Sequence, residues 1–424
     1  MMIGEPPDRA AIRSDQLTKL RALIAAIAGR NRFYSPRLQK ANITADLESL
    51  DAFSQRMPLT TKQQLAEDQL ASPPWGTVLT YPIESYTRFS QTSGTTRKPI
   101  RWLDTNASWE WMIGNWQRVY DAAAVGAGDR LMFTFSFGPF LGFWVAFDAA
   151  SRRGCLCIPG GGLSTEGRLR MMIDSGANVL CSTPTYAIRL AESARELKID
   201  LSSVKIRAII VAGEAGGSIP AVRRRMEELW RGAKVYDHHG MTEVGPVSYP
   251  SRTCADALHI IESSYFAEVI DPATGSPVEK GGTGELVLTT LGRLGSPLLR
   301  YRTGDLVKPA YPDRGDMLLV GGILSRADDM VVVRSVNVYP SAVEEVMRTH
   351  AQVAEYRVEV MTNRAMTELR IQVEPRQGCG DTAALAAKLE EDLKASLSIR
   401  VPVSVVAPGT LPRFEMKAKR WVRL

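Results

Sequence analysis

Short strand-like runs alternate with helical patterns along most of this chain, and this alternation limits the possible folds more than any other feature. Ala208–Val211 precedes a helical pattern at residues 219–231, and Ala177–Cys181 precedes another at 184–197. Such alternation is typical of parallel sheets whose faces are covered by helices. Apolar residues at helical spacing also predict an amphipathic helix over residues 15–30. We therefore predict an α/β fold.

Two regions of different character follow. Residues 258–325 hold strand-like runs separated by Gly and Pro turns, which indicates a β-rich subdomain. The last hundred residues predict the order β-α-β-β-α-β of a ferredoxin-like unit, with Pro340 in the first turn of its first helix. The expected strands lie at 330–334, 355–361, 367–374 and 401–406, and the helices at 340–350 and 382–397.

These patterns divide the chain into two expected domains. The first, residues 1–326, is a large N-terminal domain of parallel sheets flanked by helices, with its β-rich portion at about 258–325. The second, residues 327–424, is a small, ferredoxin-like α+β C-terminal domain.

Charge and hydropathy exclude several classes of partner. The net charge is +6, but the basic residues are scattered. The densest cluster, Arg223–Arg225, stands beside Glu227 and Glu228 and is interpreted as a solvated helix face. No nucleic-acid-binding module accompanies it, so no nucleic-acid partner is expected. The most apolar stretch, residues 131–147, is interrupted and falls short of the roughly 20 residues of a membrane span, so no membrane partner is expected either.

The five cysteines are odd in number and irregularly spaced, which indicates a reducing compartment rather than a disulfide framework. The N-terminus shows no signal pattern, and we expect a cytoplasmic protein. Cys155 and Cys157 share one face of an apolar run and are interpreted as buried thiols.

Five short segments carry residue types suited to nucleotide chemistry. The segment Thr92–Pro99 combines hydroxyls, a glycine and a lysine, which suits a loop that folds over phosphates. Thr242 and Glu243 could hold Mg²⁺ through oxygen atoms. Asp305, after a glycine turn, could accept both hydroxyls of a ribose. The last two segments are Ser325–Ser335 and Met416–Arg420, and each of the five could alone be an ordinary loop.

Two adjacent histidines invite a metal interpretation, but the strand-like pattern argues against it. His238 and His239 are neighbours, and neighbouring residues on a strand face opposite ways. We therefore expect them not to share one ion.

Taken in order, these segments resemble the acyl-adenylate-forming superfamily, and within it the phenylacetate–coenzyme A ligase family. The resemblance covers nearly the whole chain. Its segments are Asn31–Tyr34, Pro58–Lys62, Thr92–Pro99, Gly160–Gly162, Gly213–Glu214, Gly240–Glu243, Tyr301–Asp305 and Asp328–Pro340.

The resemblance implies an enzyme that uses ATP and Mg²⁺ to convert a carboxylic acid into an acyl-AMP and then transfers the acyl group to coenzyme A. It implies catalytic roles for Lys417, Glu243 and Arg326, with Glu243 holding Mg²⁺ and Asp328 acting as the hinge. It implies ribose binding by Asp305 and adenine contact by His239, where a tyrosine commonly stacks. The remaining implied nucleotide residues are Thr92, Ser93, Gly94, Thr95, Thr96, Lys98, Gly213, Glu214, Asp237 and Thr242.

An aromatic run stands where the family places its substrate pocket. The residues concerned are Phe135, Phe137, Gly138 and Phe140, although alternating Phe residues can also be ordinary core. A pocket with aromatic walls would favour an aryl or arylacetic acid over a short, polar acid.

Four residues depart from the family pattern and leave alternatives open. Ser335 replaces a glycine beside the expected coenzyme A channel, so the acceptor could instead be a carrier-protein thiol or an amine. Arg97, His239 and Met416 are the other departures, and a nucleotide-binding relative without turnover is the third reading. Relatives are often dimers, so the resemblance leaves a homodimer open. Some relatives also bind zinc through Cys and His around residues 250–260, where this chain has Cys254 and His259 but no fuller ligand set.

Overall fold

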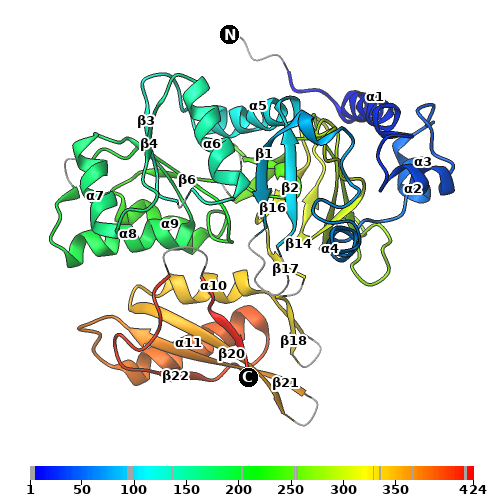
Figure 1. Ribbon diagram of the computed structural model, residues 1–424. Coiled ribbons are helices and arrows are strands. Elements are labelled where there is room, and N and C mark those ends of the chain that lie inside the picture. The colour runs from blue at the N-terminus through cyan, green and yellow to red at the C-terminus, as the bar shows by residue number, and fades with distance from the viewer. Residues whose placement is uncertain are drawn as a thin grey trace.

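Two lobes of unequal size make up the chain in the computed structural model (Figure 1). The larger lobe runs to β17 (Ser325–Arg326), and the smaller lobe begins with β18 (Val331–Val333). The structure describes residues 5–92, 99–135, 137–201, 204–252, 254, 256–327, 329–333, 336–363, 366–414 and 418–424. Within them, no helix is long and apolar enough to cross a lipid bilayer.

A parallel sheet organises one half of the larger lobe. Its five described strands lie in the order β4-β3-β5-β6-β7, and every neighbouring pair is parallel. The chain passes from β3 to one side and returns on the other, so a topological switch point lies between β3 and β5, where open α/β sheets bind ligands. The strands are β3 (Arg130–Phe133), β4 (Leu156–Pro159), β5 (Val179–Ser182), β6 (Ala208–Val211) and β7 (Lys234–Asp237).

Helices cover both faces of this sheet, as predicted. Alternate strand residues enter different cores: Leu131 and Phe133 pack with α5 and α6, whereas Met132 packs with α7, α8 and α9. Proline stands at the first position of α8 and α9, where its missing N–H costs nothing. The helices are α5 (Asn106–Ala122), α6 (Leu141–Arg152), α7 (Thr165–Asp174), α8 (Pro184–Glu196) and α9 (Pro220–Leu229).

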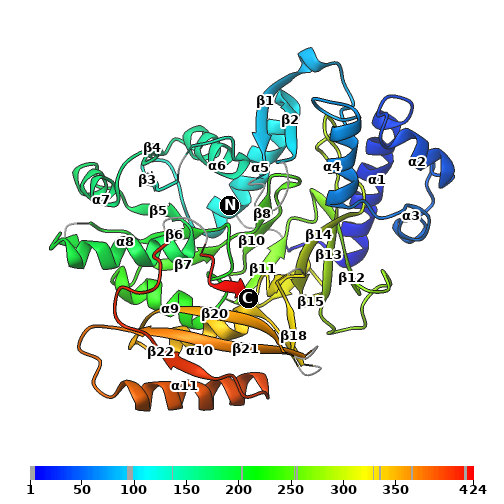
Figure 2. The same ribbon diagram turned by 60° about the horizontal axis from the view of Figure 1, so that its bottom comes forward.

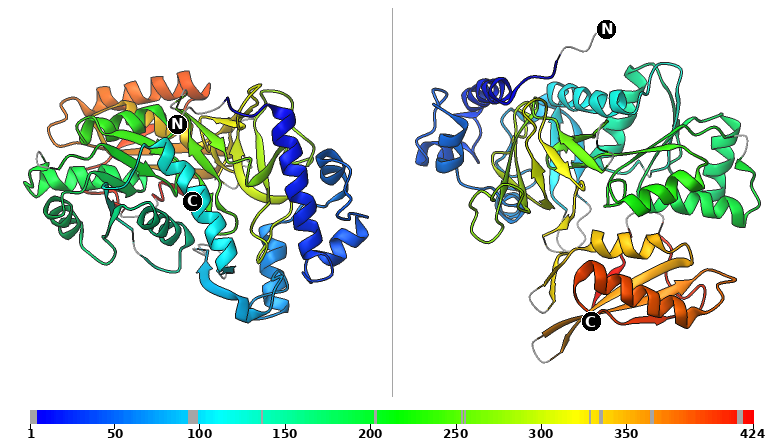
Figure 3. Two further views of the ribbon diagram at one scale, coloured as in Figure 1. Left: turned by 90° about the horizontal axis from the view of Figure 1, so that it is seen from above. Right: turned by 180° about the vertical axis from the view of Figure 1, so that it is seen from behind.

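The predicted β-rich portion forms two antiparallel sheets beside the parallel one (Figure 3). Their strand orders are β10-β11-β16-β15 and β12-β13-β14-β17. The strands are β10 (Ser248–Pro250), β11 (Ala257–Ile260), β12 (Tyr265–Ile270), β13 (Gly284–Thr290), β14 (Tyr301–Val307), β15 (Pro309–Ala310) and β16 (Leu318–Val320).

The N-terminal helices pack on these antiparallel sheets. The predicted first helix is α1 (Arg9–Ile27); it starts earlier than expected because the Asp8 carboxylate accepts from Ala11 N and caps it. Leu20, Leu23 and Ile24 of α1 share one core with the antiparallel strands. The other elements here are α2 (Ser35–Lys40), α3 (Leu50–Arg56), α4 (Lys62–Ala71), the 3₁₀ turn Ile83–Ser85, and the hairpin of β1 (Tyr86–Gln91) and β2 (Arg101–Thr105).

The smaller lobe keeps the predicted element order but builds its sheet differently. The described strands lie in the order β22-β21-β20-β23. The strand expected at 330–334 instead pairs with β19 in a separate hairpin, and C-terminal β23 takes a sheet edge parallel to β20. The elements are β19 (Val336–Val338), α10 (Pro340–Thr349), β20 (Val353–Asn363), β21 (Met366–Pro375), α11 (Thr382–Leu397), β22 (Val403–Val405) and β23 (Trp421–Arg423).

Polar contacts join the two lobes where α9 and α10 lie side by side (Figure 2). Glu345 of α10 accepts from Ala221 N at 2.8 Å and so caps α9, which has no side-chain cap of its own. Arg376 of the smaller lobe pairs with Glu192 of α8 at 2.7 Å. The lobes therefore meet through charges and a helix cap.

This interface corrects one prediction. The cluster Arg223–Arg225 is not a uniformly solvated face: Arg223 and Arg225 are half-buried and pair with Asp256 and Glu192, and only Arg224 is exposed. The cause is tertiary, because α9 lies between the parallel sheet and the smaller lobe.

Candidate active site

Asp305 lies at the centre of a buried polar group on β14. Register in the sheet sets Asp305 opposite Arg326 of β17, and Arg326 donates to Asp305 Oδ1 at 2.8 Å. His239 Nε2 lies 2.9 Å from Asp305 Oδ2. Burial alone would raise the pKa of Asp305, but the His239 and Arg326 contacts outweigh it and lower that pKa below its ordinary value. The carboxylate is therefore held ionised.

Gly304 lets Arg326 approach this strand. Its φ is +76°, and a Cβ there would stand 2.6 Å from an Arg326 guanidinium nitrogen. Arg326 also donates to Thr303 O at 2.7 Å. Only glycine fits that backbone angle beneath the guanidinium. The glycine turn predicted before Asp305 is not a turn, because Gly304 lies within β14, where the pairing with β13 is irregular.

Arg293 holds the turn that carries Glu243 in place through hydrogen bonds. This fully buried guanidinium donates to both Asp104 oxygens at 2.7 Å. It also donates to the carbonyls of Thr242 at 3.0 Å and Glu243 at 2.7 Å. The turn joins β8 (Gly240–Met241) to β9 (Gly245–Pro246) and is tied to β2. The predicted Thr242 and Glu243 thus sit on a rigid support.

The Glu243 carboxylate fits an oxygen ligand for a divalent cation. Glu243 is buried, and its Oε1 has no hydrogen-bond donor among the described residues. Lys62 Nζ lies 2.9 Å from Oε1, close enough for an ion pair although the angles are not those of a hydrogen bond. An orphaned carboxylate oxygen is what Mg²⁺ takes when substrate phosphates and water supply its other ligands.

Tyr301 links Glu243 to the Asp305 group. Its phenol is buried, and burial raises its pKa first. The charges of Glu243 and Asp305 raise it further, and that of Arg326 opposes them. Glu243, Asp305 and Arg326 therefore all lie near this buried phenol, and Tyr301 places the Glu243 turn next to β14 and β17.

Thr92 forms the neck of the predicted phosphate loop. Thr92 N donates to Ile100 O at 3.0 Å, and Ile100 N donates to Thr92 Oγ1 at 3.1 Å. This pair extends the β1–β2 hairpin up to the loop. The predicted Ser93, Gly94, Thr95, Thr96 and Lys98, with Arg97, lie outside the described residues, as do Asp328, Ser335, Met416 and Lys417.

Glu214 ties the C-terminal segment to the larger lobe. It follows Gly213, whose φ is +95°, after the carboxyl end of β6. One Glu214 oxygen accepts from Thr185 N at 2.8 Å near the start of α8, and the other accepts from Ala418 N at 2.8 Å. Glu214 therefore bridges the lobes at the residue that follows Lys417.

Asp237 ends β7 among polar neighbours. It accepts hydrogen bonds from Ser218 Oγ and from His238 N. Burial raises the pKa of Asp237 to about 6, although these donors favour its ionised form. Asp237 thus lies at the carboxyl end of β7, next to the carboxyl end of β6, after which Glu214 follows.

The adjacent histidines face opposite ways, as predicted. His238 contacts Ser248 O through Nδ1 at 2.8 Å and packs on Trp116, whereas His239 faces Asp305. Burial lowers the pKa of His238 to about 4, so it is neutral near pH 7. At the suspected zinc position, His259 stacks on Tyr249 and Cys254 is exposed.

The predicted pocket residues lie after β3, at the switch point of the parallel sheet. Phe135 stacks on Phe143 with ring centres 4.0 Å apart, and Phe140 approaches the same ring edge-on. Phe137 makes edge contacts with Trp144 and Phe147, and Gly138 O accepts from Trp144 Nε1 at 3.0 Å. These contacts make one aromatic wall.

This aromatic wall adjoins the nucleotide side of the site. Gln91 N, at the end of β1, donates to Pro139 O at 2.8 Å. Helix α6 also packs against β8 and β9, which flank Glu243. Gly161 packs closely against the aromatic wall, because a Cβ at this position would lie 2.9 Å from Phe135 O. The wall, the neck of the phosphate loop and the Glu243 turn are neighbours.

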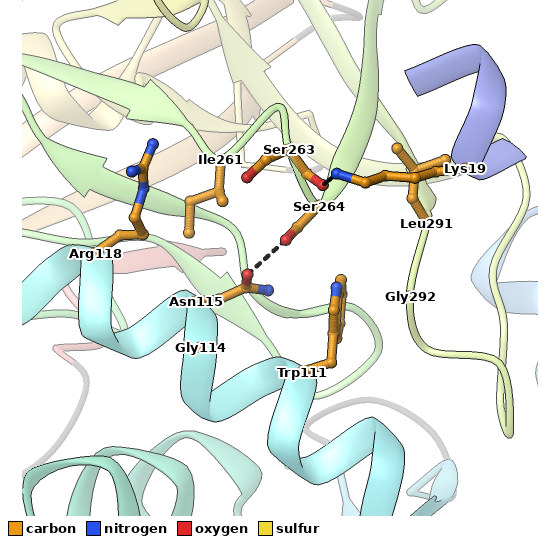
Figure 4. A pocket seen from close by; sticks show the side chains of 10 residues that line it. All are labelled: Lys19, Trp111, Gly114, Asn115, Arg118, Ile261, Ser263, Ser264, Leu291 and Gly292. Atoms are coloured by element: carbon orange, nitrogen blue, oxygen red, sulfur yellow. Dashed lines mark hydrogen bonds between the residues drawn. The ribbon is translucent and has the colours of Figure 1, made fainter. Parts of the chain in front are cut away.

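A separate hollow of about 460 Å³ lies elsewhere, on the outer side of α5 (Figure 4). Among the described residues its lining includes none of the predicted site residues. The lining residues are Lys19, Trp111, Gly114, Asn115, Arg118, Ile261, Ser263, Ser264, Leu291 and Gly292.

Sequence reasoning missed Arg293 and Lys62. Arg293 carried no local signal, because its partner Asp104 lies 189 residues away in the chain. Lys62 lay inside the resembling segment Pro58–Lys62, and its position at the start of a helix was a usable signal.

The comparisons with known proteins agree with this geometry. The sequence matches the AMP-binding enzyme family at residues 62–292 and the AMP-binding enzyme C-terminal domain at 335–423. Phenylacetate-coenzyme A ligase from Pseudomonas putida is 30% identical over 424 residues, which is 96% of this chain and 93% of that protein. These matches confirm the predicted family.

The placement of the two lobes can be compared with two solved forms of one relative. 2-Hydroxyisobutyryl-CoA ligase in its postadenylation state, in complex with 2-HIB-AMP, aligns with a TM-score of 0.92 at 27% identity, covering 99% of this chain and 91% of that one. The same relative in its thioesterification state, with 2-HIB-AMP and CoA, gives 0.73 at 28% identity and the same coverage. The arrangement of the lobes here is thus more similar to that relative's postadenylation form than to its thioesterification form, and the predicted fold class is confirmed. The chain belongs to the AMP-binding enzyme family, and its likeness to coenzyme A ligases of that family extends over nearly its whole length.

Proposed function

We propose that this chain is an AMP-forming acid–coenzyme A ligase that acts on an aryl or arylacetic acid. The acid attacks ATP to give an acyl-AMP and pyrophosphate, and the thiol of coenzyme A then displaces AMP to give an acyl-CoA. One observation carries the proposal: Glu243, a buried carboxylate paired with the half-exposed Lys62, shares the neighbour Tyr301 with Asp305 and Arg326 in a chain of this family.

Charge explains why these residue types meet here. A carboxylate and a triphosphate repel each other, and Mg²⁺ held by Glu243 would neutralise phosphate charge as they approach. Asp305 is kept ionised by His239 and Arg326 and would accept the ribose hydroxyls. Thr92 fixes the base of a loop that would cover the phosphates.

The C-terminal segment would complete the adenylation site. Glu214 holds Ala418 N, and Lys417 is the preceding residue. We infer that this contact delivers Lys417 to the sheet edge for the first step. Withdrawal of the smaller lobe, with its boundary after Arg326 and its hinge at Asp328, would then admit the thiol.

The aromatic wall supports the acid class. The rings of Phe135, Phe137 and Phe140 present apolar surface beside the Glu243 turn. Such walls bind an aromatic acid through area and edge-to-face contacts, and they offer a short, polar acid nothing comparable.

An acid screen tests the function. The protein is incubated with ATP, Mg²⁺ and a panel of aryl, arylacetic and short hydroxy acids, and pyrophosphate release is measured with and without coenzyme A. We expect acid-dependent pyrophosphate release with aryl acids, and thioester only when coenzyme A is present. Release without any coenzyme A-dependent product would favour a carrier-protein or amine acceptor. Nucleotide binding with no release for any acid would reject turnover.

The thiols support a reducing compartment such as the cytoplasm. All five cysteines are free. Cys155 is buried in one apolar cluster with Cys181, as predicted for Cys155, whereas Cys157 is only partly buried and packs against that cluster. Burial raises the pKa of Cys157 to about 12. Such thiols serve packing rather than disulfide chemistry.

A further inference from the structure

Lys62 occupies an unfavourable place for a cation. It is the first residue of α4, whose N-terminus already carries the positive end of the helix dipole. Thr61 and Gln64 form a complete capping box there, and no acidic residue stands in the first turn. The helix start therefore has no use for the lysine charge, so the reason for a lysine lies in a tertiary contact.

The segment before Lys62 is fastened to the strand that carries Asp305. Thr60 N donates to Arg300 O, and Arg302 N donates to Thr60 O, both at 2.9 Å, so that Thr60 lies beside Tyr301 in a parallel bridge. The Thr60 hydroxyl also donates to Leu299 O at 2.8 Å. These bonds fix the start of α4 relative to the site.

From this position Lys62 reaches the predicted metal ligand. Its Nζ lies 2.9 Å from Glu243 Oε1, and the Lys62 side chain is 51% exposed while that of Glu243 is 4% exposed. Because the angles are not those of a hydrogen bond, Oε1 keeps its acceptor capacity. The ammonium neutralises the carboxylate without saturating it.

The other described cations at this site are already engaged. Arg293 is fully buried and uses its donors on Asp104 and on two carbonyls. Arg326 donates to Asp305 and Thr303 O. Lys62 differs because its charge is half-exposed and sits on a flexible four-carbon stem.

We propose that Lys62 is a further residue of the nucleotide site: it neutralises Glu243 before MgATP binds and then turns its ammonium to the phosphates. A divalent cation competes better than an ammonium for a carboxylate oxygen, and the released lysine stays within reach of the anion bound there. The inference rests on the proposed function, since it takes MgATP as the ligand.

The experiment compares Lys62→Met, which keeps the length of the side chain but removes its charge, with Lys62→Arg and wild type. Lys40→Met, an exposed lysine at the end of α2, is the matched control. MgATP affinity is measured by calorimetry without acid. The melting temperature is measured with Mg²⁺ alone, and pyrophosphate release is measured with the preferred acid.

The proposal predicts changes in opposite directions. Lys62→Met should weaken MgATP binding at least about tenfold, because one phosphate contact is lost, and should increase the thermal stabilisation by Mg²⁺ alone, because Glu243 loses its competitor. Lys62→Arg should retain most of the MgATP affinity, and Lys40→Met should match wild type. A merely structural pair would weaken both kinds of binding together.

The outcomes separate this inference from the proposed function. Wild-type affinity for MgATP in Lys62→Met, or a parallel loss of MgATP and Mg²⁺ binding, would overturn the role of Lys62 alone. Failure of wild type itself to bind MgATP or to release pyrophosphate would overturn the proposed function first.

Discussion

The ion pair beneath the Glu243 turn and the ion pairs between the lobes differ in their exposure to solvent, and therefore in the cost of breaking them. Arg293 and Asp104 are both 0% exposed and joined by two parallel hydrogen bonds beneath the Glu243 turn. Between the lobes, Arg376–Glu192 and Arg224–Glu345 are partly open to solvent. Breaking a buried pair is costly, whereas surface pairs contribute little. The ion pair that supports the Glu243 turn is therefore costly to break, whereas the ion pairs between the lobes are not.

The largest expected effect comes from breaking the permanent side. Arg293→Leu would leave Asp104 buried and charged without a partner, and should lower the free energy of unfolding by about 3–5 kcal/mol. Denaturant unfolding measures it. Arg152→Leu is the control, since the Arg152–Glu110 pair joins helices of the same lobe at the surface, and it should cost under about 1 kcal/mol. Equal losses in both variants would erase the contrast.

Glu243→Gln should come next in size, acting on chemistry rather than stability. The amide keeps the shape but loses the charge that would hold Mg²⁺, so acid-dependent pyrophosphate release should fall by about 100-fold or more. Unfolding should stay close to wild type. Glu166→Gln, an exposed glutamate on α7, serves as control. Unchanged turnover in Glu243→Gln would show that Glu243 is not a ligand of the metal ion.

A pH titration tests the fixed sheet edge. Because the pKa of Asp237 is about 6 in the folded chain, above its unfolded value, its contribution to stability is present below about pH 4 and is lost as pH rises to 6. Asp237→Asn cannot ionise, so the variant does not lose this stability as the pH rises. The stability of the variant relative to wild type should rise between pH 4 and pH 7, by about 1–2 kcal/mol because the residue is partly exposed.

His238 acts in the opposite sense and remains in both proteins of that titration. Its folded pKa is about 4, below the unfolded value, so its contribution is lost as pH falls from about 6.5 to 4. Stability of the Asp237→Asn variant should therefore climb with pH across this window more steeply than that of wild type. A variant curve parallel to wild type would show that Asp237 does not titrate there.

The smallest effect is expected at the reversible interface. Glu192→Gln with Glu345→Gln removes the charge of two lobe contacts worth up to about 1 kcal/mol together. Adenylation should slow about fivefold or less, while thioester formation from supplied acyl-AMP should hold or increase. Glu196→Gln, which pairs with Arg189 inside α8, is the matched control. Slowing of both steps alike would argue against an interface that only stabilises the adenylation arrangement.

Sequence reasoning succeeded where a signal is local. Pro184 and Pro220 mark the starts of α8 and α9, and the strand at Ala208–Val211 was predicted to the residue. It also predicted that His238 and His239 face different ways, and they do, although both lie between β7 and β8 and not on a strand. Among the site residues, Asp305 and Glu243 could be named by resemblance, but not their partners.

It failed where a partner comes from far along the chain. The sequence of residues 330–334 is that of an ordinary sheet strand, yet this strand pairs with β19 in a separate hairpin, and residues after 420 form the sheet edge beside β20. The sequence of Arg223–Arg225 predicts a solvated helix face, but in the fold α10 packs against α9 and Glu192 pairs with Arg225. No pattern within a window of residues contains these neighbours.

The sequence by itself determined the elements, the family and the charged residue types, because periodicity, capping and turn chemistry act between near neighbours. Only the tertiary structure decided that Arg326 meets Asp305, that Lys62 meets Glu243, and that Glu214 holds Ala418 across the lobes. Those contacts depend on strand register and lobe placement, which are set by burial of apolar surface over the whole chain.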